Sequence, residues 1–410
     1  MQVLIISTSD IHGGAAIAAY RLMNALNAHG VEAKMMVRDK RSDNKNIIQV
    51  GSKIQNKWNF YKERGHIFLK NRFSRENLFD ISIANTGISI TDTPEFKQAH
   101  VIHLHWINQG MLSIGEIGKI LASGKKVVWT MHDMWAFTGI CHHAGTCTHF
   151  HQSCGNCPYL KTASKNDLSY RIFKSKQSVF THGMIRFVAC SNWLRNLAEK
   201  SPLTKGHKIV SIPNPIDTRQ YFPKDRAESK QIFNLPTDKK IILFAAAKAS
   251  DKRKGMDYLI EAAKTIEDKN IMFLIAGAKG DEIAQQLPGL SVNIGYIDPD
   301  KMPDLYNAAD VFVTPSLQEN LPNTIMESMA CGTPCVGFNI GGIPEMITHK
   351  ENGYVAEYKN AKDLANGLLW TLFEADHENF AINAREKVLT EYSQEEVAGR
   401  YLKVYGEQHQ

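Results

Sequence analysis

Two carboxylates, Glu319 and Glu327, lie close together along the chain. The apolar run before them, residues 310–315, is typical of a buried strand, and Pro322 and Gly332 are placed as at the start and the end of a helix. We therefore expect Glu319 on a loop and Glu327 on the helix. A helix N-terminus favours a phosphate through its unpaired N–H groups and its dipole, and flanking carboxylates accept hydrogen bonds from hydroxyls. This layout suits a bound sugar nucleotide.

Basic residues follow an earlier predicted strand, 241–245, and precede a predicted helix; they are Lys248, Lys252, Arg253 and Lys254. Cations in a low-dielectric cleft stabilise the charge of a departing diphosphate, a role that otherwise falls to a divalent metal. An exposed basic turn is the alternative interpretation. Two later loops, one with Tyr296 and one with the Gly-Gly pair 341–342, offer further contacts for a ligand.

Two loops of the N-terminal half carry similar signals. Gly13 and Gly14 follow the predicted strand 3–7 and let a ligand approach the backbone closely, although a Gly-Gly pair also makes a plain tight turn. His132 follows the predicted strand 127–131, where a parallel sheet opens toward its ligand. We expect His132 to face the ligand, although a single strand-end histidine can also be structural.

Another pair of histidines, His103 and His105, alternates along one predicted strand and therefore shares a face. Such a face permits metal binding, but the sequence offers no evident third ligand. Contact with an acceptor molecule and simple packing are the other interpretations.

Four of the seven cysteines fall in a Cys/His-rich insertion near residues 139–160; they are Cys141, Cys147, Cys154 and Cys157. The Cys-x-x-Cys spacing of the last two is half of a zinc site, and four thiolates would pin an insertion without a core of its own. The first pair is spaced more widely than in zinc fingers. We therefore weigh a structural zinc against free or redox-active thiols, since the cytosol disfavours disulfides.

The helices and strands that position these residues alternate in the same way in the two halves of the chain. Strands are predicted at 3–7, 101–104, 127–131 and 187–190, with a helix at 17–29, and again at 241–245, 271–276, 292–294, 311–314 and 335–337, with helices at 256–266, 301–307 and 324–330. Two prolines interrupt regular structure at 212–217. The sequence thus predicts an α/β protein with two Rossmann-like, doubly wound parallel-sheet domains facing a cleft.

The expected boundaries are residues 1–213 for an acceptor-side domain and 214–390 for a nucleotide-sugar-binding domain, with a C-terminal helix at about 391–410 packed back on the first. The 410 residues exceed the size at which one core usually stops growing. No apolar run approaches the roughly 20 residues that cross a bilayer, and the first residues lack a basic region and a cleavage site. We expect a cytoplasmic protein.

Charge is distributed unevenly. Residues 1–213 hold 27 Lys and Arg against 13 Asp and Glu, a net +14, whereas residues 214–410 hold 21 against 29, a net −8. The stretch 53–75 mixes basic and aromatic residues, which suits an anionic membrane, such as the inner face of the cytoplasmic membrane, or an anionic acceptor. A solvated helix covering its own domain is the other interpretation. No nucleic-acid-binding signature is present.

The order of these motifs resembles retaining glycosyltransferases of the two-domain GT-B architecture, and specifically family 4. The resemblance rests on Gly13-Gly14, His132, the joint 214–217, Lys254-Gly255, the pair Glu319 and Glu327, Gly332-Thr-Pro334 and Gly341-Gly342. The stretch 129–142 further resembles a subgroup from bacterial surface-polysaccharide gene clusters.

The resemblance implies roles for these residues. Glu327 would bind the nucleotide ribose, Glu319 would contact the donor sugar at the reacting centre, and Lys254 would hold the diphosphate. His132 would approach the sugar from the first domain. The remaining implied donor contacts are Gly14, Asn320, Leu321 and Tyr296, and Lys248 or Arg253 would replace the arginine of a Gly-Arg pair that this chain lacks. Gly13, His103 and His105 would lie on the acceptor side.

The implied reaction is transfer of a hexose from a nucleotide-diphosphate sugar to a saccharide or lipid-linked acceptor, with retention of configuration and no cofactor for catalysis. Two other functions stay open: a catalytically silent nucleotide-sugar-binding assembly partner, and a nucleotide-sugar epimerase of the same architecture. A donor-hydrolysis assay separates the first from an enzyme, and conversion of the donor without any acceptor identifies the second.

Overall fold

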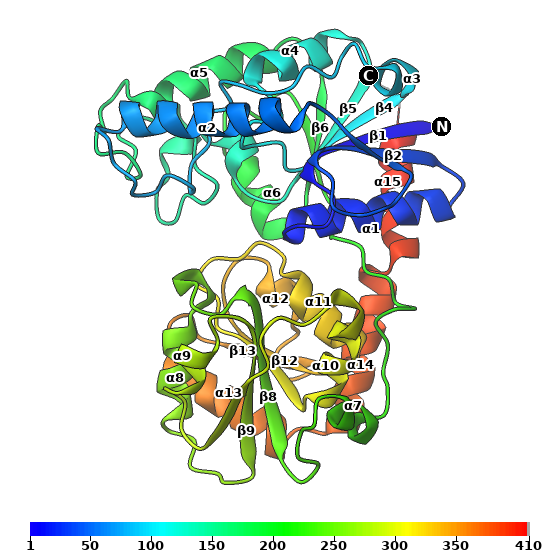
Figure 1. Cartoon of the computed structure of the whole chain (residues 1–410), viewed down its shortest axis with the longest axis vertical. Coiled ribbons are helices and arrows are strands. Elements are labelled where there is room, and N and C mark those ends of the chain that lie inside the picture. Colours follow the sequence, from blue (N-terminus) through cyan, green and yellow to red (C-terminus); the bar gives the residue numbers. More distant parts are fainter. Residues whose placement is uncertain (408–410) are drawn as a thin grey trace. The chain divides into compact units, whose positions relative to one another are not determined.

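The computed structural model describes residues 1–407 and divides into two compact units (Figure 1). The N-terminal unit comprises Met1–Pro215 and the described residues from Val397 onward, and the C-terminal unit comprises Ile216–Glu396. The C-terminal helix is α15 (Gln394–Gly406), shorter than the expected 391–410, whose last three residues lie outside the described part. Its Tyr401 and Tyr405 are buried in the N-terminal unit.

The N-terminal unit is built on a seven-stranded sheet in the order β3-β2-β1-β4-β5-β6-β7, with every neighbouring pair parallel. The strands are β1 (Gln2–Ser9), β2 (Glu32–Asp39), β3 (Ile47–Gln49), β4 (Val101–Leu104), β5 (Lys126–Met131), β6 (Ile185–Ala189) and β7 (Lys208–Ser211). The predicted strands in β1, β4, β5 and β6 are confirmed. The sequence analysis missed β2, β3 and β7.

Helices cover both faces of this sheet. They are α1 (Gly14–Ala28), α2 (Lys53–Lys70), α3 (Pro94–Gln98), α4 (Ile114–Ala122), α5 (Leu168–Phe180) and α6 (Asn192–Ala198). Along β1, Val3 and Ile5 belong to the apolar cluster that contains α1 and α15, whereas Leu4 and Ile6 belong to the one that contains α4 and α5. Alternate side chains of a strand point to opposite faces, so this partition is what a doubly wound sheet requires.

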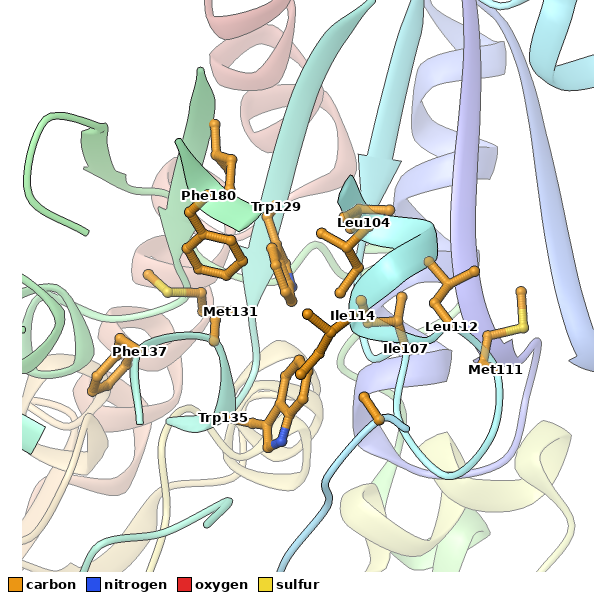
Figure 2. Close-up of a cluster of buried hydrophobic side chains, with 14 of the residues drawn as sticks. Leu104, Ile107, Met111, Leu112, Ile114, Trp129, Met131, Trp135, Phe137 and Phe180 are labelled. Atoms are coloured by element: carbon orange, nitrogen blue, oxygen red, sulfur yellow. The ribbon is translucent and has the colours of Figure 1, made fainter. Parts of the chain in front are cut away.

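Large aromatic side chains fill the second of these clusters. Figure 2 shows Trp129 and Met131 of β5 close to Phe180 of α5 and to Trp135, which lies in the short 3-10 helix η1 (Trp135–Phe137). The ring centres of Trp129 and Phe180 are 5.9 Å apart in an edge-on arrangement. This core holds the carboxyl end of β5, from which His132 emerges.

The C-terminal unit is a six-stranded parallel sheet in the order β10-β9-β8-β11-β12-β13. Its strands are β8 (Lys240–Lys248), β9 (Ile271–Ala278), β10 (Leu290–Asn293), β11 (Val311–Thr314), β12 (Cys335–Phe338) and β13 (Gly353–Ala356). The five predicted strands are confirmed, and β13 was missed. The helices are α7 (Arg226–Ile232), α8 (Met256–Ala263), α9 (Asp281–Ala284), α10 (Met302–Ala308), α11 (Asn323–Ala330), α12 (Ile343–Met346), α13 (Ala361–Phe373) and α14 (His377–Glu391).

Each sheet has one point at which the strand order reverses. In the N-terminal unit the chain runs from β1 outward to β3 and then returns to place β4 beside β1; in the C-terminal unit β11 returns beside β8 in the same way. Ligands of doubly wound sheets bind beyond the carboxyl ends of the strands at such points. The fold thus indicates that a ligand would bind at the loops after β1, β4, β8 and β11.

Within residues 1–407, none of the helices combines the length and the apolar character needed to span a bilayer.

Candidate functional site

The loops after β8 and β11 meet at the reversal point of the C-terminal sheet. Lys254 Nζ forms an ion pair with Glu319 Oε1, and Ser316 Oγ donates to the same oxygen at 3.3 Å. The backbone N–H of Leu317 donates to the carbonyl of Arg253 at 2.7 Å. Two residues that the sequence predicted for the diphosphate and the sugar are therefore brought together.

Two glycines make this close approach possible. Gly255 has a φ of +70°, and a Cβ there would lie 1.7 Å from the carbonyl oxygen of Pro315. Gly341 has a φ of +60°, and its Cβ would lie 1.8 Å from the carbonyl oxygen of Glu319. Only glycine fits either position without a backbone shift. The conformation of the Glu319 loop therefore depends on both neighbouring loops.

Glu327 occupies a buried position on α11. It is 7% exposed, and its Oε2 accepts a hydrogen bond from the hydroxyl of Tyr306 at 2.9 Å. Tyr306 on α10 is fully buried, and its burial together with the charge of Glu327 raises the phenol pKa well above its usual value. The phenol thus remains a donor at physiological pH and orients the carboxylate. The sequence analysis missed Tyr306, because a tyrosine inside an apolar helix indicates packing.

The cations of the β8 loop differ in their partners. Arg253 pairs with Asp251, with Nη2 2.8 Å from Oδ2. Burial opposes ionisation of Asp251, but hydrogen bonds and charge from Arg253 outweigh it and lower the pKa of that carboxyl. Lys248, exposed at the end of β8, forms no ion pair with any other residue among 1–407. Lys252 is likewise exposed and forms no ion pair within residues 1–407, so a ligand would meet both charges without first breaking an ion pair.

The other predicted donor contacts occupy different settings. Asn320 and Leu321 are each 7% exposed, and the Asn320 carbonyl accepts from the N–H of Gly342 at 2.8 Å. Tyr296 is 76% exposed and follows β10, the edge strand of the sheet. Its role as a donor contact stays a prediction.

At the reversal point of the N-terminal sheet, Asp10 shapes the glycine turn. Its carboxylate accepts hydrogen bonds from the N–H groups of Ile11, Arg41 and Ser42, the last at 2.8 Å. Burial opposes its ionisation, but the bonds from Ser42 and Arg41 outweigh this and lower the pKa of Asp10. Gly13 has a φ of +93° and directly precedes α1, which starts at Gly14 rather than at the expected residue 17. The sequence analysis did not single out Asp10.

His132 is partly buried and pairs with the buried His105. Its Nε2 is 2.9 Å from Nδ1 of His105, and its Nδ1 is 3.5 Å from the sulfur of Cys190. The two histidines follow adjacent strands, β4 and β5, which explains the contact. Burial lowers the pKa of His132 to about 4, although the charge of Asp133 acts in the opposite direction. At neutral pH, His132 is therefore uncharged and can offer a ligand hydrogen bonds but no charge.

His103 lies in the interior of the N-terminal unit. It is fully buried, its Nδ1 is 2.7 Å from the hydroxyl of Tyr405, and its Nε2 is 2.7 Å from Oγ1 of Thr130. Burial lowers its pKa to about 3. With both ring nitrogens engaged, His103 holds α15 against the sheet, which favours the packing interpretation over contact with an acceptor.

The four cysteines of the insertion line one small cavity together with His149. All are free thiols, and burial raises the pKa of Cys141, Cys154 and Cys157 to about 12. Between residues 1 and 407, no three or more His, Cys, Asp or Glu side chains are arranged to hold a metal ion. Phe150 and Leu160 of the insertion belong to the main apolar cluster of the N-terminal unit, so the insertion packs on that core. Structural zinc stays a prediction.

Two parallel Rossmann-like domains with ligand loops at their reversal points define the GT-B class of glycosyltransferase folds. Two family profiles match the chain: "Glycosyltransferase Family 4" over residues 12–220, and "Glycosyl transferases group 1" over residues 225–387. The first covers half of the chain. The protein therefore belongs to glycosyltransferase family 4.

Curated relatives match about half of the chain. N-acetyl-alpha-D-glucosaminyl L-malate synthase of Bacillus anthracis is 28% identical over 215 residues, 50% of this chain and 56% of the relative. N,N'-diacetylbacillosaminyl-diphospho-undecaprenol alpha-1,3-N-acetylgalactosaminyltransferase of Campylobacter jejuni is 32% identical over 235 residues, 55% of this chain and 60% of the relative. The chain thus aligns with little more than half the length of either relative.

Solved structures share the fold along the whole chain. Sucrose-phosphate synthase from Thermosynechococcus elongatus has a TM-score of 0.67 at 18% identity, with 98% of both chains covered. An Anabaena protein in complex with UDP-glucose has a TM-score of 0.64 at 15% identity and covers 98% of this chain and 99% of its own. At these identities the likeness concerns the fold alone.

Proposed function

We propose that this protein is a retaining glycosyltransferase that moves a hexose from a nucleotide-diphosphate sugar to a saccharide or lipid-linked acceptor, in the biosynthesis of a cell-surface polysaccharide. The observation that carries the proposal is the meeting of Lys254 and Glu319 at the reversal point of the C-terminal sheet, beside the buried Glu327. The relatives support the substrate class, because the Campylobacter jejuni enzyme is named as a sugar transferase acting on a lipid-linked acceptor.

The donor would occupy three neighbouring positions. Glu327, oriented by Tyr306, accepts the ribose hydroxyls. The diphosphate lies on the cations, where Lys254 exchanges Glu319 for a phosphate and Lys248 adds its unpaired charge. Glu319, released from Lys254, then accepts hydrogen bonds from the sugar. These side chains lie on the segments that follow β8 and β11, which are neighbouring strands of the sheet.

The N-terminal unit would supply the acceptor side and contacts to the transferring sugar. A neutral His132, oriented by His105, provides a hydrogen bond without charge. Gly13 and Gly14 let a phosphate or a sugar approach the start of α1. His105 remains a candidate there, because its Nε2 is buried and has no hydrogen-bond partner among the described residues.

The chemical step would take place on one face of the sugar. The bond from the anomeric carbon to the diphosphate oxygen breaks, the bond to the acceptor oxygen forms on the same face, and the acceptor proton passes to the leaving diphosphate. The cations stabilise the charge that develops on this group. Peripheral contact with an anionic membrane, where lipid-linked acceptors lie, is part of the proposal.

The test combines binding with turnover. A panel of nucleotide sugars is screened for thermal stabilisation, because specific binding raises apparent stability by mass action. The best donor is then assayed for transfer with wild type, Glu319→Ala and the control Glu267→Ala, whose side chain is exposed on the loop after α8. Loss of transfer in Glu319→Ala alone supports the assignment. Near-normal turnover of Glu319→Ala contradicts it.

A further inference from the structure

Helix α2 exposes large apolar side chains and buries polar ones, which is the reverse of an ordinary surface helix. Ile54, Trp58, Tyr61 and Leu69 are 82%, 66%, 65% and 61% exposed. Their spacing places them on one side of the helix, which we call the outer face of α2. A helix that only covers its own domain turns such residues inward and its polar residues outward.

The inner side of α2 is mostly polar, and several of its side chains are hydrogen-bonded to neighbouring segments. Asn56 donates to the carbonyls of Arg38 and Val50 at 3.1 and 3.0 Å. Glu63 accepts from the N–H groups of Ile83 and Ala84 at 2.7 and 2.9 Å. These buried polar contacts fix the rotation of the helix, because turning it would leave them unsatisfied. The outward position of the apolar residues is therefore specified by the sequence.

The exposed charge on and after α2 has a single sign up to residue 75. The exposed basic residues are Lys53, Lys57, Lys62, Lys70, Arg72 and Arg75. The one acidic residue of this stretch, Glu63, is fully buried and paired with Arg64 at 3.2 Å. Not one of the four lysines forms an ion pair with another described residue. The cations thus flank the apolar face without being neutralised.

The apolar surface continues beyond the helix. Phe73 is 67% exposed and packs edge-on against Phe68, with ring centres 5.6 Å apart. Phe79, 61% exposed, stacks on Phe60 at 6.5 Å. The 18 residues of α2 extend about 27 Å, so the apolar surface is long and narrow.

We propose that the outer face of α2, with its flanking cations, docks on the surface of an anionic phospholipid bilayer. Trp and Tyr favour the interface between headgroups and acyl chains, and lysine stems reach the anionic headgroups above it. Charge complementarity selects this occupant over a second copy of the chain, because two copies joined through α2 would bring like charges together. The inference rests on the membrane contact proposed above and names the surface that makes it.

The test is cosedimentation of the full chain with vesicles in the absence of donor and acceptor, so that its outcome is independent of sugar transfer. Wild type should bind vesicles rich in phosphatidylglycerol, bind pure phosphatidylcholine weakly, and be released by salt. Each cation near an anionic surface contributes about 1 kcal/mol, or roughly fivefold in affinity, so the triple variant Lys53→Glu, Lys57→Glu, Lys62→Glu should bind at least about 100-fold more weakly.

A second variant removes the apolar contacts and keeps the charge: Trp58→Gln, Tyr61→Gln, Leu69→Gln. It should lose binding that resists salt. The matched controls change exposed side chains of the C-terminal unit: Lys264→Glu, Lys269→Glu, Lys362→Glu for charge, and Phe373→Gln, Ile382→Gln, Leu389→Gln for apolar contact. Both controls should bind as wild type does. Wild-type binding by both α2 variants overturns the proposal, as does a wild-type dimer that the apolar variant dissociates.

Discussion

The hydrogen bond between Tyr306 and Glu327 allows a sharp test of the donor site. Tyr306→Phe removes one oxygen atom and keeps the ring, which packs edge-on against Phe312 at 5.7 Å. The carboxylate of Glu327 then loses a 2.9 Å partner inside a buried pocket. A hydrogen bond to a charged group contributes about 1.5–3 kcal/mol, and the burial of both residues favours the upper half of this range.

For a unit of this size, a loss of about 2.5 kcal/mol lowers the unfolding temperature by about 5–10 °C. A less well oriented Glu327 should also bind the ribose more weakly, so the KM for the donor should rise more than kcat falls. Thermal unfolding and donor-dependent kinetics measure the two effects separately.

A matched control is Tyr354→Phe. The Tyr354 hydroxyl donates to Asp363 at the same distance, 2.9 Å, but this pair is only partly buried. Its loss should cost less than that of the Tyr306 bond and should leave the donor KM unchanged. Equal effects of the two substitutions on stability, or an unchanged donor KM in Tyr306→Phe, would refute the reasoning that Tyr306 positions Glu327.

Three further predictions follow from the same geometry. Lys248→Ala should raise the donor KM more than Arg253→Ala, because Arg253 is already paired with Asp251 and Lys248 is not; the reverse order in steady-state kinetics would exclude Lys248 as the substitute for the missing arginine. The free energy of unfolding, measured by denaturant titration, should fall as the pH drops from about 7 toward 4. A histidine in the unfolded chain binds a proton near pH 6.5, whereas His132 in the folded protein does so only at about pH 4. Between these values the unfolded state binds more protons, so acid favours it. A flat profile would contradict the burial of the histidine cluster. Metal analysis of the purified protein, before and after a chelator, separates structural zinc from free thiols: zinc that is lost when Cys154 and Cys157 are replaced by Ser supports the zinc site, and metal-free wild type would end the zinc hypothesis.

The central strands of both sheets could be predicted from the sequence, because short apolar runs between turn residues mark buried parallel strands. The strand 101–104 was predicted to the residue. The missed strands β3, β7 and β13 are edge strands. The missed β2 is an inner strand, but its apolar run, residues 35–37, is short and has charged residues on both sides. An edge strand lacks the apolar run on which such predictions depend.

The donor site was predictable in part. Glu319, Glu327 and Lys254 carry the family pattern, and the structure brings Lys254 to Glu319. Three features could not be predicted: the role of Tyr306, the role of Asp10, and the hydrogen bonds to both nitrogens of His103. Each depends on contacts between segments that are distant in sequence. Tyr405 contacts His103 from a position 302 residues away. No spacing along the chain reports such a contact.

Hydrogen–deuterium exchange with the best-stabilising nucleotide sugar tests the central claim most directly. If the donor binds at the reversal point of the C-terminal sheet, amide exchange should slow in residues 248–255 and 316–327, and this protection should be lost in Glu327→Gln. Slower exchange elsewhere in the chain, with these two segments unchanged, would contradict the account.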